Sequence, residues 1–218
     1  MAETLKFAVV AFTSLIAIVN PLGAVPMFVA MTASYTGAHR AATLRRAILT
    51  ALVLLFAFTL IGTWILRFFG ITTQAFQIAG GIIFFGIGWD MLQARRSRVK
   101  TTPEEESEGA LKEDVGIIPL GIPTLAGPGA ITTVIALNGQ ADNLIQSAAV
   151  YMGILGTVAV SWITLAAAPV LTRRVSQTGM NVFTRLMGLL VTVIGAQFVI
   201  NGTSTVVLDI VARMRALR

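Results

Sequence analysis

Asn20-Pro21-Leu22-Gly23-Ala24-Val25-Pro26 breaks the hydrophobic run Leu5–Ala33 near its middle. As one straight helix this run would be about 44 Å long, whereas the hydrocarbon core of a bilayer is about 30 Å thick. Proline removes a backbone donor and clashes with the preceding turn, and glycine loosens the backbone. The run therefore predicts a membrane span that unwinds at this stretch.

A second stretch of the same character interrupts another hydrophobic run. It reads Pro119-Leu120-Gly121-Ile122-Pro123 and continues as Ala126-Gly127-Pro128-Gly129-Ala130. A helix in lipid has to satisfy its own backbone hydrogen bonds, so such breaks are tolerated only where protein surrounds them. Paired breaks at corresponding places in two halves of a chain are typical of transporters whose solute site lies between inverted repeats.

The two halves of the chain match at a constant offset of 107 residues. The pairs at this offset include Pro21 with Pro128, Gly81 with Gly188, Gly88 with Gly195, and Asp90 with Gln197. Each half holds three apolar segments, and an odd number of spans reverses the chain direction, so the halves would be inverted relative to one another. We predict a first repeat over 1–93, a charged linker over 94–116 and a second repeat over 117–218.

The composition is that of a membrane protein. Hydrophobic residues make up 56% of the chain, charged residues 12%, and the mean hydropathy is +0.82, whereas soluble domains carry about 25% charged residues. We predict an all-α membrane protein of six transmembrane segments, of which the first and fourth are broken. The segments are Leu5–Ala33, Ala47–Leu66, Ile71–Met91, Ile117–Leu137, Leu144–Leu171 and Asn181–Leu208.

The basic residues predict an orientation for these segments. Eleven of the sixteen lysines and arginines lie in the connections after the first, third and fifth segments, and five lie on the other side. Because basic connections stay in the cytoplasm, we expect the linker 94–116 on the cytoplasmic side and both termini outside. The net charge of +6 does not indicate nucleic-acid binding, since the charges lie in short connections between apolar segments.

Asn20-Pro21-Leu22-Gly23-Ala24-Val25-Pro26-Met27-Phe28 resembles the N-P-x-G-x-x-P-x-F signature of the MarC family of bacterial and archaeal inner-membrane proteins. The stretch from Ile118 to Thr132 is similar to the second signature of that family, and the resemblance covers nearly the whole chain. Some members are described as transporters of small neutral amino acids such as glycine and alanine, and the family is grouped with the lysine-exporter superfamily. The resemblance implies a secondary transporter of this type in the inner membrane, with proton coupling left open.

The two breaks supply the predicted solute site. An unwound helix exposes N–H groups at one end, which suit a carboxylate, and C=O groups at the other, which suit an ammonium group. Glycine would let the solute approach the backbone closely. The alternative is local, namely caps for the broken helices or close packing through small residues. The candidate residues are Asn20, Pro21, Gly23, Pro26, Pro123, Gly127, Pro128, Gly129, Thr132 and Thr133.

Four polar residues within the apolar segments are candidates for the transport path or for ion coupling. Asp90 is a functional candidate because intramembrane carboxylates are costly; the alternative is an interfacial residue paired with an arginine. Gln74 and Gln77 share a helical face. They and Gln197 either line the path or hydrogen-bond between helices.

The sequence holds no set of residues for catalysis. It has no cysteine, and its single histidine, His39, lies in a connection, whereas a hydrolase needs a nucleophile with a base or several metal ligands. We expect no enzymatic activity and no metal or other cofactor. The expected partners are the lipid bilayer and a small neutral amino acid, without nucleic acid, and a homo-oligomer is left open.

Alternating access, by rocking of one half against the other, is the expected mechanism of transport. Two alternatives stay open: a non-transporting membrane partner or regulator, and an exporter of another small solute. A saturable, substrate-specific flux from the purified protein alone would separate a carrier from a regulator.

Overall fold

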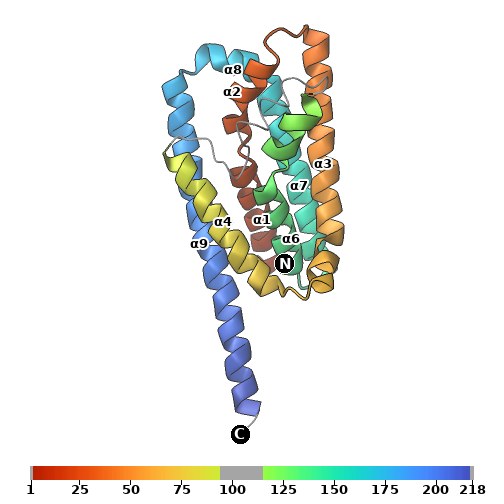
Figure 1. The fold of residues 1–218 in the computed structure, drawn as a ribbon, viewed down its shortest axis with the longest axis vertical. Helices are drawn as coiled ribbons and strands as arrows, with labels where there is room; N and C mark the ends of the chain where they lie inside the picture. The colour runs from red at the N-terminus through yellow and green to blue at the C-terminus, as the bar shows by residue number, and fades with distance from the viewer. Residues whose placement is uncertain (1, 94–114, 217–218) are drawn as a thin grey trace.

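The computed structural model describes residues 2–93 and 115–216, and every regular element in these ranges is helical (Figure 1). The elements in chain order are α1 (Ala2–Val19), α2 (Pro21–Met31), α3 (Gly37–Phe68), α4 (Thr73–Leu92), η1 (Gly116–Leu125), α6 (Pro128–Gly139), α7 (Leu144–Ala166), α8 (Ala168–Arg174) and α9 (Gln177–Ala216). The prediction of an all-α protein is confirmed for these ranges. The predicted linker 94–116 falls almost wholly on residues outside them.

Length and apolar composition mark the membrane spans. Five helical stretches are long and apolar enough to cross a bilayer: α1 together with α2, then α3, α4, α7 and α9. The pair of η1 and α6, bent by 54°, makes a sixth if it is one span. These stretches coincide with the six predicted segments.

Two spans extend beyond their predicted bounds. α3 begins at Gly37, where Thr36 caps it by accepting a hydrogen bond from the N–H of His39 at 3.3 Å. α9 runs past the predicted Leu208 to Ala216, and its 40 residues give a length of about 60 Å. Its C-terminal part extends beyond the other helices (Figure 1). Hydropathy misses such extensions because the arginines in them form helix as well as most apolar residues do.

The two broken spans leave the helical conformation at the predicted stretches. Asn20 separates α1 from α2 with a left-handed φ of 49° and ψ of 67°, and Pro21 then begins α2. η1 is interrupted by a kink, and Ile118 and Ile122 within it have extended backbone angles. Each precedes a proline, which drives the residue before it out of the helical region. The breaks therefore come directly from the proline positions in the sequence.

The broken spans occupy the centre of the bundle. The most apolar part of Glu3–Met31 is 56% buried, against 28% for α3 and 22% for α9. α1 packs against α7, whereas η1 and α6 pack against α3. Figure 1 shows α1 and α6 lying between α3 on one side and the crossed pair of α4 and α9 on the other. The first broken span is therefore more buried than any of the unbroken spans, as the free backbone groups at a break require.

α4 and α9 cross at two glycine contacts, and no two described elements pack more extensively. A methyl group at Gly81 would lie 2.6 Å from the carbonyl oxygen of Gly195, and one at Gly88 would lie 2.7 Å from that of Gly188. Gly88 follows Gly81 by seven residues on α4, whereas its partner Gly188 precedes Gly195 by seven residues on α9. The two helices are therefore antiparallel. Small residues let helix backbones approach closely in lipid, where van der Waals packing drives helix association.

We expect Gly81→Ala to destabilise the detergent-solubilised protein by about 1–3 kcal/mol, because the added methyl group overlaps the backbone of α9. Gly86→Ala is the matched control, since it lies on the same helix and nothing lies within 4 Å of a methyl group there. Thermal unfolding compares the two variants. Equal unfolding temperatures would contradict the close crossing of α4 and α9.

Candidate functional site

The first break is held by its own side chain. Asn20 is buried, and its Oδ1 accepts a hydrogen bond from the N–H of Gly23 at 3.2 Å. A methyl group at Gly23 would collide with the Asn20 carboxamide, so the cap requires glycine there. Asparagine suits this junction because it tolerates the left-handed conformation and caps helix N termini. The geometry at Asn20 is that of a helix cap.

The second break has no such cap. Gly127 is the N-cap of α6, and no described side chain accepts a capping hydrogen bond from the free N–H groups of its first turn. A methyl group at Gly127 would collide with the carbonyl oxygen of Pro123, so the chain can turn here only with glycine. Gly129 and Ala130, in the first turn of α6, are buried. The partial positive charge of this helix start therefore lies inside the protein without a capping oxygen.

The two breaks lie next to each other in the interior. The Thr124 hydroxyl donates to the carbonyl oxygen of Pro119 at 2.8 Å and lies 3.4 Å from the sulfur of Met27, which brings η1 against α2. A methyl group at Gly129 would lie 3.2 Å from Cγ2 of Ile18 and 3.0 Å from Cδ1 of Ile87, which brings α6 against α1 and α4. The predicted convergence of the two broken spans is thus present in the structure.

The remaining predicted residues make local contacts in this conformation. The Thr133 hydroxyl donates to the carbonyl oxygen of Gly129 at 2.8 Å within α6, and Cγ2 of Thr132 packs against Gly80 of α4. These two threonines therefore serve helix packing rather than a shared polar site. Among the predicted prolines, burial decreases in the order Pro21 (buried), Pro26 and Pro123 (half-buried) and Pro128 (exposed).

A narrow interior void, too tight to admit a water molecule in this conformation, lies beside the breaks, between the ends of α1 and η1 and the helices α3 and α7. Its lining residues are Val19, Ile48, Ala51, Leu55, Leu125, Thr157, Val158 and Ser161. Thr157 is fully buried, and its hydroxyl has no hydrogen-bond partner among the described residues. Ser161 donates to the carbonyl oxygen of Thr157 at 2.8 Å. A buried hydroxyl without a partner is costly, which makes Thr157 a candidate for solute contact.

Sequence reasoning missed Thr157 and Ser161. Both lie on α7, four residues apart and therefore on one face of an otherwise apolar helix. That spacing is the signal that could have identified them, but hydroxyl residues are common in membrane helices and bond to their own backbone. Only the unpartnered Thr157 hydroxyl in the structure distinguishes this pair.

An open cavity of about 340 Å³ lies at the face of the bundle that carries the N terminus. We call it the vestibule. Its polar lining is rich in amide groups and includes one buried hydroxyl. The lining residues are Glu3, Lys6, Phe7, Val10, Ser14, Leu137, Gln140, Asp142, Gln146, Ile194, Gln197, Phe198 and Asn201.

The vestibule presents charges of both signs above an apolar base. Lys6 and Glu3 form an exposed ion pair at 3.1 Å, the Oε1 of Gln146 accepts from the N–H of Asp142 at 2.8 Å, and the Gln197 amide donates to Asn201. Such a lining suits a small polar solute with positive and negative groups. Within residues 2–93 and 115–216, no group of three or more His, Asp or Glu side chains is placed to hold a metal ion.

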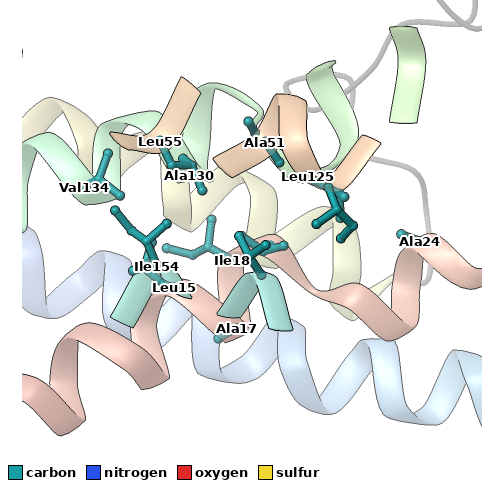
Figure 2. Packing of buried hydrophobic residues seen from close by; sticks show 14 of the residues in the cluster. Leu15, Ala17, Ile18, Ala24, Ala51, Leu55, Leu125, Ala130, Val134 and Ile154 are labelled. Atoms are coloured by element: carbon teal, nitrogen blue, oxygen red, sulfur yellow. The ribbon is translucent and has the colours of Figure 1, made fainter. Parts of the chain in front are cut away.

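A packed apolar layer separates the vestibule from the interior void. It consists of Leu15 and Ile18 on α1, Val134 on α6 and Ile154 on α7, each at most 1% exposed (Figure 2). On each of these helices the layer lies between the vestibule residues and the breaks or the void. We call it the apolar layer. A solute that passes from the vestibule to the breaks would have to part it.

The four polar path candidates lie in three different places. Gln197 lines the vestibule. Gln77 is buried in α4 with its Nε2 unpartnered among the described residues, whereas Gln74, one turn away, is half-buried. Asp90 lies near the other end of α4 and is also half-buried. The structure therefore does not bring these four side chains together.

Asn20→Ala should destabilise the protein by about 1–3 kcal/mol, because it removes the cap and places an L side chain without a local hydrogen bond in the left-handed region. Asn20→Gly should cost less, since glycine adopts this conformation freely. Thermal unfolding of the purified variants measures the difference. If Asn20→Gly proved less stable than Asn20→Ala, that result would contradict the left-handed backbone conformation at position 20.

Comparison with known proteins places the chain in a family. The model for "MarC family integral membrane protein" matches residues 5–207. A UPF0056 membrane protein of Methanocaldococcus jannaschii is 36% identical over 91% of this chain and 96% of its own length. The UPF0056 membrane protein YvbG of Bacillus subtilis is 38% identical over 87% of this chain and 90% of its own length. The UPF0056 membrane protein YhcE of Escherichia coli is 36% identical over 88% of this chain and 89% of its own length. No solved structure matches. The chain therefore belongs to the MarC family of multi-pass integral membrane proteins, found in bacteria and archaea.

Proposed function

We propose that the chain is a secondary transporter that carries small neutral amino acids, of the glycine or alanine type, across the cytoplasmic membrane by alternating access. It is built from two inverted three-helix repeats, with the solute site at the two breaks. The observation that carries the proposal is the reciprocal packing of α4 and α9. Transporters with inverted repeats hold their solute near the bilayer midplane, where discontinuous helices meet.

The reciprocal packing follows from the offset between the halves. At 107 residues, Gly81 corresponds to Gly188 and Gly88 to Gly195. If each glycine is replaced by its counterpart in the other half, the contact of Gly81 with Gly195 becomes the contact of Gly188 with Gly88. The structure has both contacts. A two-fold axis produces such self-complementary contacts. Because the two helices are antiparallel, this axis runs across them and so lies in the membrane plane.

The central helices pack in the same exchanged way. α1, from the first half, packs on α7 of the second half, and η1 with α6 packs on α3 of the first half. α3 also packs on α7, and α1 on α6. Each of these contacts maps onto itself or onto another contact when the halves are exchanged. The agreement between central and peripheral helices supports one axis for the whole bundle.

A zwitterion fits the chemistry around the breaks. The uncapped start of α6 suits a carboxylate, and the Thr157 hydroxyl can both donate and accept. The described lining of the void holds no charged side chain, so a solute with net charge would be desolvated without a partner at high cost. Because the void admits no water molecule in this conformation, it has to widen to hold a solute, and small amino acids require the least widening.

The vestibule supplies a route from one face of the membrane. The distribution of basic residues puts this face outside the cytoplasm. The vestibule lies between α9 on one side and α1, α6 and α7 on the other. This favours motion of the α4–α9 pair as one body against the other helices, instead of one repeat rocking against the other. Such a motion would part the apolar layer.

The direct test is uptake of radiolabelled glycine and alanine into liposomes that contain the purified protein, with and without a pH gradient. We expect saturable uptake that other small neutral amino acids compete away, and the pH dependence would show whether protons drive it. No uptake by correctly folded protein would contradict the proposal and favour another solute or a regulatory partner.

Thr157→Val tests the contact of the solute with the void. The substitution keeps the shape of the side chain and removes a hydroxyl that has no described partner, so stability should stay the same or rise by about 1 kcal/mol. The KM for glycine uptake should rise about tenfold, because one hydrogen bond to a charged group is worth about 1.5–3 kcal/mol.

Thr59→Val is the matched control for this substitution. The Thr59 hydroxyl is buried as well, but it donates to the carbonyl oxygen of Leu55 at 2.6 Å and does not line the void. Its removal should leave the KM unchanged. If Thr157→Val transported glycine with the KM of the unmodified protein, the void would have no part in solute binding.

A further inference from the structure

The vestibule is larger than the proposed solutes require. Its volume of about 340 Å³ falls in the range of pockets that enclose drug-sized molecules. Glycine has no side chain and alanine has only a methyl group, so either would fill a small part of it. The interior void, by contrast, admits no water molecule in this conformation. The two places therefore differ in the size of the molecule that they can hold.

The inner part of the vestibule is apolar. Leu137 and Phe198 line it and are buried, and Phe7 and Ile194 line it and are half-buried. We call these four side chains, which come from α1, α6 and α9, the vestibule base. Apolar surface that leaves water is the main favourable term in binding of this kind. The base therefore suits an aliphatic or aromatic group of a ligand.

Two buried polar side chains also line the vestibule. Ser14 is buried, and its hydroxyl has no hydrogen-bond partner among the described residues. Its neighbour Thr13 makes the usual bond of a helical hydroxyl, to the carbonyl oxygen of Val9 at 2.7 Å. The carboxamide of Gln146 is buried as well, and its Oε1 accepts from the N–H of Asp142. The Ser14 hydroxyl is thus a polar group that a bound molecule can reach.

Charged groups of both signs lie at the outer edge of the vestibule. They are the exposed side chains of Glu3, Lys6 and Asp142, which we call the vestibule rim. An ammonium group there suits the carboxylate of a ligand, and the carboxylates suit its ammonium group. Because exposed ion pairs contribute little to affinity, the apolar base has to supply most of the discrimination between ligands. An amino acid with a large apolar side chain matches both the rim and the base.

We propose that the vestibule is a binding site for amino acids with large apolar side chains, such as leucine and phenylalanine, which the protein binds from its N-terminal face and does not carry. The side chain rests on the vestibule base, and the charged groups lie at the rim. Beneath them lies the closed apolar layer, and the void beyond it would have to widen most for such molecules. A molecule bound there blocks the route of glycine; this consequence rests on the proposed function, whereas the binding itself does not.

Cysteine protection tests the binding, since the chain has no cysteine of its own. Ser14→Cys places a thiol in the vestibule, and a charged, membrane-impermeant methanethiosulfonate is the reagent. Leucine should slow this reaction at a concentration about tenfold lower than glycine does, because only leucine buries an apolar side chain on the base. The control is Leu144→Cys, which lies at the same face, is 86% exposed and does not line the vestibule. Leucine should leave its rate unchanged.

Val10→Cys is the second reporter, because Val10 lines the vestibule and is 50% exposed. It replaces Ser14→Cys if that variant fails to fold. Leucine that slows neither reporter, or slows the Leu144→Cys control equally, would overturn the proposal. A lack of reaction at both vestibule positions would also overturn it, since the vestibule would then be closed to solutes.

Uptake into membrane vesicles tests the block. Labelling of Leu144→Cys identifies whether right-side-out or inverted vesicles present the N-terminal face to the medium. Leucine outside those vesicles should inhibit glycine uptake competitively, and radiolabelled leucine should not accumulate in them. The opposite vesicles should need a leucine concentration about tenfold higher, because the apolar base lies at the N-terminal face. Saturable leucine uptake, or equal inhibition from both faces, would contradict the proposal.

Ile194→Ala tests the contact of the leucine side chain with the base. The concentration of leucine for half-protection should rise about fivefold, because fewer apolar groups then cover the ligand. Val193→Ala is the matched control, since Val193 precedes Ile194 on α9, is 57% exposed and does not line the vestibule. Equal half-protection in the two variants would show that leucine does not rest on the base.

The outcome of these experiments is separable from that of the proposed function. Saturable glycine uptake without protection by leucine would keep the carrier and overturn the vestibule site. Protection by leucine without any glycine uptake would keep the vestibule site and overturn the proposed solute.

Discussion

The bilayer core offers no water to a free backbone N–H or C=O, and the architecture depends on this constraint. Proline and glycine release such groups in the first and fourth spans, at Asn20 and around Pro123 and Gly127. Both spans are therefore drawn to the centre of the bundle, and the unbroken helices α3, α4, α7 and α9 surround them. The same requirement brings the two breaks together inside the protein.

Much of this arrangement could be predicted because its causes are local. Hydropathy located the five long apolar stretches and the bent pair of η1 and α6, and proline located both breaks to within a few residues. The glycines at 81, 88, 188 and 195 were recognisable as a repeat, but their partners were not, because an offset in sequence does not say which helices cross. The sequence left two interpretations of Asn20, a helix cap or a solute contact. In this conformation its Oδ1 accepts a hydrogen bond from the N–H of Gly23 and caps the helix.

The candidate site was harder to predict because it depends on relations between distant helices. Thr157 becomes notable only when its hydroxyl is found buried and unpartnered. Gln146 and Ser14 become notable only when α1, α6, α7 and α9 enclose a cavity. Solute contact by Thr132 and Thr133 stays a prediction. In this conformation Thr132 packs against Gly80 of α4, and the Thr133 hydroxyl donates to the backbone of its own helix.

The central claim is that two related faces open alternately around one site. Pulsed electron–electron resonance between spin labels on two symmetry-related pairs tests it most directly. One pair is Leu144 with Ile200 at the N-terminal face, and its counterpart at the offset of 107 is Gly37 with Gln93. The account predicts that glycine shifts the two distance distributions in opposite directions. Shifts of the same sign, or no shift in either pair while glycine is bound, would contradict it.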